Sequence, residues 1–78
     1  MKFICYNNEI RTFNEVTLIL LNETTITISF IDKDMWVIRD DDKLILTRLF
    51  NVIHCFLNKL EKHCLNIEWE HAGLSFSE

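Results

Sequence analysis

The fold is decided by residues 43–65, which read KLILTRLFNVIHCFLNKLEKHCL. Apolar residues recur there at alternating steps of three and four, a spacing that keeps them on one face of a helix. The centre of this face consists of Leu46, Leu49, Ile53, Phe56 and Leu60. Its flanks widen the face beyond the seam of a coiled coil, with Ile45, Phe50, Val52, Leu57 and Cys64. The pattern predicts one long amphipathic helix that lies across a sheet.

The residues before this helix alternate between apolar and polar side chains, as half-buried antiparallel strands do. The predicted strands are residues 2–6, 9–13, 16–21, 24–31 and 35–39. Short turns rich in Asn, Asp and Glu separate them, at residues 7–8, 22–23 and 32–34. One or two short strands follow the helix. We therefore predict a single α+β domain over residues 1–78, with an antiparallel sheet of four to five strands, the helix on one face and a short C-terminal strand.

A chain of 78 residues buries only about 60% of its unfolded surface, so a partner or a second copy would add useful stability. Cys5, Cys55 and Cys64 are odd in number and lack the spacing of a disulfide framework, which predicts free thiols in a reducing compartment. No apolar run approaches the roughly 20 residues of a membrane span. We expect a soluble, cytoplasmic protein with no membrane partner.

The charge balance is 8 basic against 12 acidic residues, a formal net charge of −4. Nucleic-acid binding depends mainly on Lys and Arg that neutralise phosphates, so this balance disfavours direct binding to DNA or RNA. An acidic domain is better suited to a basic surface. The expected partner is a larger, basic protein or a nucleoprotein complex.

Two His-Cys pairs raise the question of a metal site or a cysteine nucleophile. His54-Cys55 and His63-Cys64 are nine residues apart, which on one helix is half a turn out of phase, so the pairs would face opposite ways. Neighbours on a helix also diverge by about 100°, so His54 could not serve as a base for Cys55. We predict no metal, no cofactor and no catalytic residue; Cys55 is interpreted as a tolerated surface thiol, and Cys64 and Cys5 as core residues.

Three consecutive carboxylates, Asp40, Asp41 and Asp42, precede the helix. The simplest interpretation is helix capping, because carboxylates accept hydrogen bonds from the first turn. In an antiparallel meander the strand ending at residue 39 returns beside the turn at residues 22–23. Glu23 and the three aspartates would then share one acidic edge of the molecule.

The second face of the sheet is the predicted binding surface. If the helix covers the face with Val16, Leu18, Leu20, Ile26, Ile28 and Phe30, the opposite face carries Ile19, Leu21 and Ile31 among Thr17, Thr25 and Thr27. One of the pairs Ile4/Tyr6 or Phe3/Cys5, and one of the pairs Met35/Val37 or Trp36/Ile38, would join them. Such a face is more apolar than a solvated surface needs and favours a partner site, although a Thr-rich face also satisfies β propensity.

These features predict a small, acidic, non-enzymatic inhibitor that covers a basic protein surface. A toxin-immunity protein, an antitoxin and a phage-encoded blocker of a nucleic-acid-handling host or defence complex all fit this description. The predicted partner-binding residues are Thr17, Ile19, Leu21, Glu23, Thr25, Thr27, Ile31, Asp40, Asp41 and Asp42. The alternatives are a structural or regulatory homodimer, and a small enzyme that uses Cys55 or the Asp40–Asp42 cluster.

Overall fold

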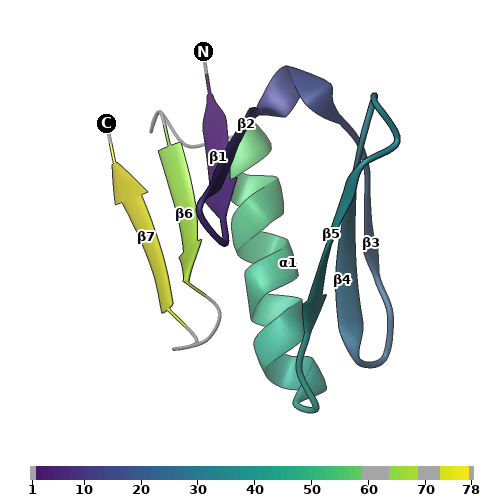
Figure 1. The fold of residues 1–78 in the computed structure, drawn as a ribbon. Coiled ribbons are helices and arrows are strands. Elements are labelled where there is room, and N and C mark those ends of the chain that lie inside the picture. The colour runs from purple at the N-terminus through teal and green to yellow at the C-terminus, as the bar shows by residue number, and fades with distance from the viewer. Residues whose placement is uncertain (1, 59–63, 69–72, 78) are drawn as a thin grey trace.

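The computed structural model describes residues 2–58, 64–68 and 73–77. The first five strands are β1 (Phe3–Tyr6), β2 (Glu9–Thr12), β3 (Val16–Leu21), β4 (Thr25–Phe30) and β5 (Met35–Arg39). A short 3₁₀ turn, η1 (Phe13–Glu15), joins β2 to β3. The helix α1 (Lys43–Asn58) and two strands follow, β6 (Cys64–Glu68) and β7 (Gly73–Ser77). The α+β class and the C-terminal strand are therefore confirmed (Figure 1).

The described strands form two sheets, which corrects the prediction of a single antiparallel sheet of four to five strands. One sheet has the order β2-β1-β6-β7, and the other has the order β3-β4-β5. Strand β6 lies parallel to β1, whereas the other pairs are antiparallel. The chain leaves the first hairpin through η1 and returns to β1 only after the helix. Side-chain alternation identifies strands but says nothing about their partners, and this is why the prediction missed the division.

The turns follow the sequence prediction, and the residues at their tips explain why. Asn7 and Asn8 both have positive φ, 52° and 66°, as in the two-residue hairpin turns that suit the twist of antiparallel strands. The β3–β4 hairpin closes with Asn22 N–H donating to Thr25 O at 2.8 Å. Lys33, with φ 71°, is at the tip of the β4–β5 turn. In this chain Asn and Lys occupy the left-handed positions that Gly fills in many proteins.

The helix is shorter than the predicted stretch of residues 43–65. The described helix extends to Asn58, and Cys64 and Leu65 lie in β6; residues 59–63 are outside the described part of the chain. Leu65 has no exposed surface, so this strand still buries a residue that the helical pattern assigned to the helix face. At the end of α1 the Lys2 ammonium donates to the carbonyl oxygens of Phe56 and Leu57. A cation from the residue just before β1 therefore stabilises the negative end of the helix.

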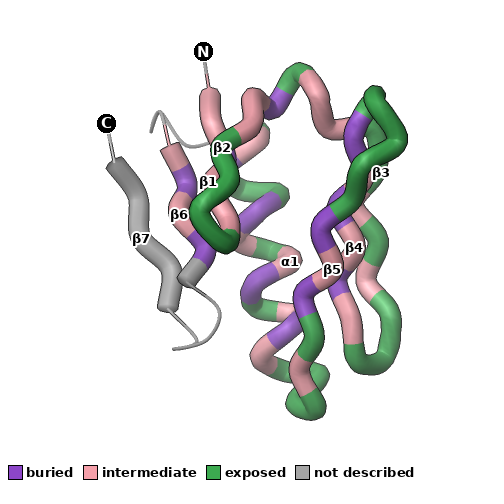
Figure 2. The backbone as a smooth tube through the Cα atoms, viewed as in Figure 1, coloured by how far each residue is buried: buried purple, intermediate pink, exposed green. Residues whose placement is uncertain are grey.

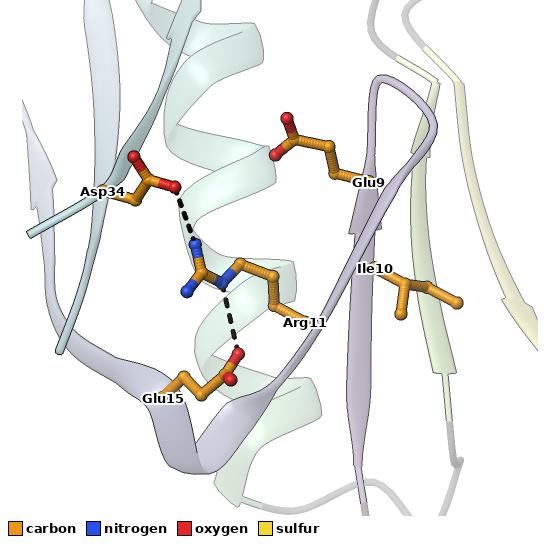
Figure 3. A pocket seen from close by; sticks show the side chains of 5 residues that line it. All are labelled: Glu9, Ile10, Arg11, Glu15 and Asp34. Atoms are coloured by element: carbon orange, nitrogen blue, oxygen red, sulfur yellow. Dashed lines mark hydrogen bonds and ion pairs between the residues drawn. The ribbon is translucent and has the colours of Figure 1, made fainter. Parts of the chain in front are cut away.

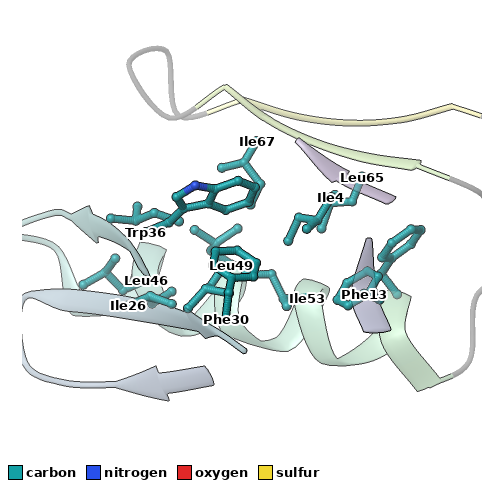
Figure 4. Close-up of a cluster of buried hydrophobic side chains, with 13 residues drawn as sticks. Ile4, Phe13, Ile26, Phe30, Trp36, Leu46, Leu49, Ile53, Leu65 and Ile67 are labelled. Atoms are coloured by element: carbon teal, nitrogen blue, oxygen red, sulfur yellow. The ribbon is translucent and has the colours of Figure 1, made fainter. Parts of the chain in front are cut away.

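One hydrophobic core joins the helix to both sheets. In Figure 1 α1 runs between the four-stranded and the three-stranded sheet, and Figure 4 shows side chains from all three converging. The helix buries Leu46, Leu49, Ile53 and Phe56, which confirms four of the five residues predicted at the centre of the face; the fifth, Leu60, lies outside the described residues. The sheets and η1 contribute Ile4, Phe13, Ile26, Ile28, Phe30, Trp36, Ile38, Leu65 and Ile67. Burial on both sides of the helix explains why its apolar face is so wide.

Candidate protein-binding face

The outer face of the three-stranded sheet is the side turned away from the helix. The strand register gives its residues in rows across the sheet: Leu18, Ser29 and Met35; Leu20, Thr27 and Val37; Thr25 and Arg39. Three of these side chains are large, apolar and exposed, namely Leu18 at 55%, Leu20 at 45% and Met35 at 57%. Exposed and half-buried residues are interspersed along β3 (Figure 2). Small hydroxyl side chains on the middle strand separate the apolar side chains of the two outer strands.

This face differs from the predicted one in β3, where the two sides are exchanged. Ile19 pairs with the buried Ile28, and Leu21 pairs with the buried Ile26, so both half-buried side chains point toward the core. A register shift between Val16 and Leu18 is the cause. It inserts one residue and moves every later side chain to the opposite face. The predictions that Ile19 and Leu21 lie on the outer face, and that Leu18 and Leu20 lie under the helix, are therefore wrong.

The other predicted residues of this face have mixed positions. Thr25 and Thr27 are on the outer face and half-buried. Thr17 is exposed at the register shift, and its Oγ1 donates to Ser29 O at 3.2 Å. Ile31 is 65% exposed and lies in the turn after β4. Neither of the two candidate pairs from residues 3–6 joins this face, because β1 belongs to the other sheet; of the β5 pairs, Met35 and Val37 do so.

The acidic edge forms as the antiparallel meander predicted. Asp40 N–H donates to Thr24 O at 3.0 Å, so the end of β5 lies beside the β3–β4 turn. Glu23 is at this turn and forms an ion pair of 2.8 Å with Lys43 in the first turn of the helix. Glu23 and the three aspartates are thus brought together, with Lys43 as a nearby base. We call Glu23, Asp40, Asp41 and Asp42 the acidic edge.

The three aspartates of the acidic edge have different roles. Asp42 Oδ1 accepts a hydrogen bond of 2.9 Å from Leu44 N–H, which caps the helix as predicted. Asp40 Oδ1 accepts one of 2.8 Å from Asp42 N–H and holds the turn before the helix. Asp41 is exposed and has no hydrogen bond or ion pair with any residue in the described part of the chain. Asp41 is therefore the carboxylate of this triplet that the fold leaves available.

A cluster around Arg11, which the sequence did not indicate, joins the two sheets at the other end. Its guanidinium contacts Glu15 at 3.2 Å, Asp32 at 2.6 Å and Asp34 at 3.2 Å, and it stacks 4.1 Å from the Phe30 ring centre. Arg11 holds the pKa of the Asp32 carboxyl below its ordinary value. The signal available in the sequence was a lone arginine in an alternating strand and two aspartates in a turn. Their meeting depends on the placement of the two sheets.

Figure 3 shows an open hollow beside this cluster, lined by Glu9, Ile10, Arg11, Glu15 and Asp34. The carboxylates of Glu15 and Asp34 are paired with Arg11. Glu9 accepts a hydrogen bond of 2.7 Å from Trp36 Nε1, which ties β2 to β5. Each carboxylate of the hollow therefore has a partner within the fold. The cluster is best explained as a structural clamp between the sheets.

Two of the three cysteines lie side by side. Cys5 and Cys64 have their sulfur atoms 3.2 Å apart and are free thiols in half-buried positions. Burial, together with the hydrogen bond and charge of Cys64, raises the pKa of Cys5 to about 11. In the parallel pair Cys64 lies opposite Phe3, which places the Cα atoms of the two cysteines roughly 8 Å apart. A disulfide needs a closer approach of the two backbones.

The His-Cys pairs do not have the geometry that the sequence argument assumed. His54 and Cys55 are exposed on the helix, and His54 packs edge-on against Phe50 with ring centres 4.5 Å apart. Cys64 belongs to a strand, so the helical phase between the pairs does not apply, and His63 lies outside the described residues. Among the described residues, no three His, Cys, Asp or Glu side chains lie close enough to hold a metal ion.

No family model, curated protein or solved structure matches this chain. Within the described residues, no helix is both long and apolar enough to cross a membrane.

Proposed function

We propose that this chain is a small non-enzymatic protein that binds a larger, basic protein or nucleoprotein complex and inhibits it by covering part of its surface. The observation that carries the proposal is the outer face of the three-stranded sheet. Leu18, Leu20 and Met35 are each about half exposed there, in a domain too small to leave such area in water without cost. Apolar side chains grouped on one face are typical of a protein-binding site.

The acidic edge supplies the electrostatic part of the proposal. The formal net charge is −4, and Asp41 is an exposed carboxylate of the acidic edge, in the turn between β5 and α1. Long-range attraction of this kind raises association rates and selects partners by charge. A basic groove that normally holds nucleic acid would be a suitable target, and the chain would compete for that groove without binding nucleic acid itself. The proposal includes a toxin-immunity protein, an antitoxin or a phage-encoded blocker that would act in this way in the cytoplasm.

Capture from lysate with two matched variants tests the proposal. Leu18→Glu places a charge on the outer face, whereas Ile10→Glu places the same charge at a 67% exposed isoleucine of the other sheet. We expect wild type and Ile10→Glu to retain one specific partner, and Leu18→Glu to retain at least tenfold less of it. Both variants must first give the wild-type circular dichroism spectrum. Equal capture by the two folded variants would show that the outer face is not the binding surface.

A homodimer is the second candidate, because β3 lies at the edge of its sheet with exposed leucines. Edge strands of this type can pair with a second copy. Light scattering over a range of concentrations distinguishes the two candidates. A monomer up to about 100 μM supports the heterologous partner, and a dimer at low micromolar concentration, corresponding to about −8 kcal/mol, supports the homodimer.

A further inference from the structure

Strand β3 has one side without a partner. It is the first strand of the three-stranded sheet, and no other described strand pairs with its second side (Figure 1). Its sequence is VTLILL, which contains no charged residue and no proline. Charged side chains and prolines are the usual means by which proteins prevent an edge strand from pairing with another chain. The register shift after Val16 disturbs only the start of the strand.

The hydrogen-bond pattern shows which backbone groups face outward. Asn22 and Thr25 form the bonded pair that closes the hairpin. Bonded and non-bonded pairs alternate along an antiparallel ladder, so Leu20 and Leu18 bond to β4. The N–H and C=O groups of Ile19 and Leu21 therefore point away from the sheet. They offer two donors and two acceptors to an added strand, spaced two residues apart as a strand requires.

We propose that β3 accepts an extended segment of the partner as an additional strand. The segment would alternate apolar and small polar residues, and it would carry Lys or Arg at the end nearest Glu23, in the turn after β3. Alternate side chains of such a segment would lie beside Leu18 and Leu20 on the outer face. The inference rests on the proposed function and names the mode of contact, which is strand addition with main-chain bonds for affinity and side chains for specificity.

Charge distinguishes this occupant from a second copy of the chain. Two-fold antiparallel pairing of β3 with itself would place the acidic edge of one copy beside the Glu15 end of the other. That end carries the three carboxylates of Glu15, Asp32 and Asp34 against two bases, Arg11 and Lys33. Both ends thus carry more carboxylates than nearby bases, and each copy has a net charge of −4. These like charges oppose the pairing of β3 with β3 of a second copy. The same charges attract a basic segment to β3.

Amide hydrogen exchange measured by NMR tests the inference with a defined probe. The probe is a seven-residue peptide of alternating threonine and valine with lysine at both ends; the control peptide has glutamate at both ends. We expect saturating lysine peptide to slow exchange at Ile19 and Leu21 at least tenfold, and the glutamate peptide to have no effect at the same concentration. Failure of the lysine peptide to protect these two amides would overturn the proposal. Equal protection by both peptides would overturn the role of charge.

Two variants at one position keep the test independent of packing losses. Ile19→Pro and Ile19→Ala both remove the isoleucine side chain, but only proline removes the outward N–H group. We expect the proline variant to bind the lysine peptide at least tenfold more weakly than the alanine variant. Equal affinities would contradict strand addition.

Protection of Ile19 and Leu21 that rises with protein concentration alone would identify a second copy as the occupant and overturn the basic segment. If only the strand inference fails, capture in the Leu18→Glu experiment still distinguishes wild type from variant.

Discussion

Among single residues, the three neighbouring aspartates before α1 have different structural roles. Asp42 caps the helix, Asp40 holds the turn before it, and Asp41 is exposed without a partner among the described residues. The run of three aspartates suggested one acidic feature, and capping was predicted correctly for its last member. The three aspartates have different roles because the turn directs each side chain differently. A run of identical residues does not indicate that path.

Asp41→Lys should slow association with the partner by about twofold to fivefold and flatten the salt dependence of the association rate, because it removes a steering charge. The free energy of unfolding should stay within about 0.5 kcal/mol of wild type, as for surface substitutions in general. Asp42→Ala is the control, since loss of the cap should cost about 0.5–2 kcal/mol. Stopped-flow association and urea titration provide the two measurements. An unchanged association rate for Asp41→Lys at low salt would contradict the steering role.

The alkylation of Cys5 should depend on pH through its raised pKa. Because the pKa of Cys5 is raised to about 11, its thiol stays protonated at neutral pH, and its alkylation should accelerate only as pH approaches that value. Exposed Cys55 should be alkylated without unfolding. Cys64→Ala should lower the pKa of Cys5, because it removes the hydrogen bond and charge of Cys64. Mass spectrometry of iodoacetamide adducts across pH measures both.

The raised pKa also has a consequence for stability. Cys5 ionises near pH 9.0 in the unfolded chain, whereas the folded chain keeps its thiol neutral up to about pH 11. The contribution of Cys5 to the free energy of unfolding is therefore complete below pH 9.0 and is lost as the pH rises toward 11.

A Cys5–Cys64 disulfide formed in the folded protein by mild oxidation would contradict the register of β1 and β6.

At the scale of elements, β3 carries the main correction to the sequence prediction. The alternation of Val16–Leu21 identified a strand and its hairpin with β4. It did not identify the buried side, because every residue from Leu18 to Leu21 is apolar and either side could face the core. One inserted residue at the register shift decided between them. By contrast, β4 alternates Ile and Phe with Thr and Ser, and its buried side was predicted correctly.

Ile19→Thr and Leu18→Thr test this assignment of the two sides of β3. Ile19 packs against the core, so its replacement should cost about 1–2 kcal/mol in the free energy of unfolding. Leu18 is 55% exposed, and the same change should cost less than about 0.5 kcal/mol. Urea denaturation measures both. If Leu18→Thr is the more destabilising variant, the assignment of the two sides must be reversed.

The helix prediction can be tested with another matched pair. Phe56 has no exposed surface, and Phe56→Ala should cost about 3–5 kcal/mol, much of the stability of a domain this small. Asn51 is exposed on the opposite side of α1, and Asn51→Ala should be nearly neutral. Thermal unfolding followed by circular dichroism compares them. Equal melting temperatures would show that the helix face is misassigned.

At the scale of the whole molecule, the composition and periodicity predicted the class, the turns and the helix face, but not the two sheets. The alternation of side chains indicates which residues are buried. Ile4 and Leu65 would be equally buried whether the strands formed one sheet or two. The parallel pairing of β1 with β6 joins residues about 60 positions apart, and no local pattern records it. The contacts that Arg11 makes between the two sheets depend on the same long-range arrangement of strands.

If the outer face and the free edge of β3 bind a protein partner, amide hydrogen exchange of the chain, alone and with the partner captured from lysate, should show it. We expect slower exchange in residues 16–21 on binding, with residues 9–12 of the other sheet unchanged. Slower exchange in β2 or α1, with β3 unchanged, would show that the partner binds elsewhere on the molecule.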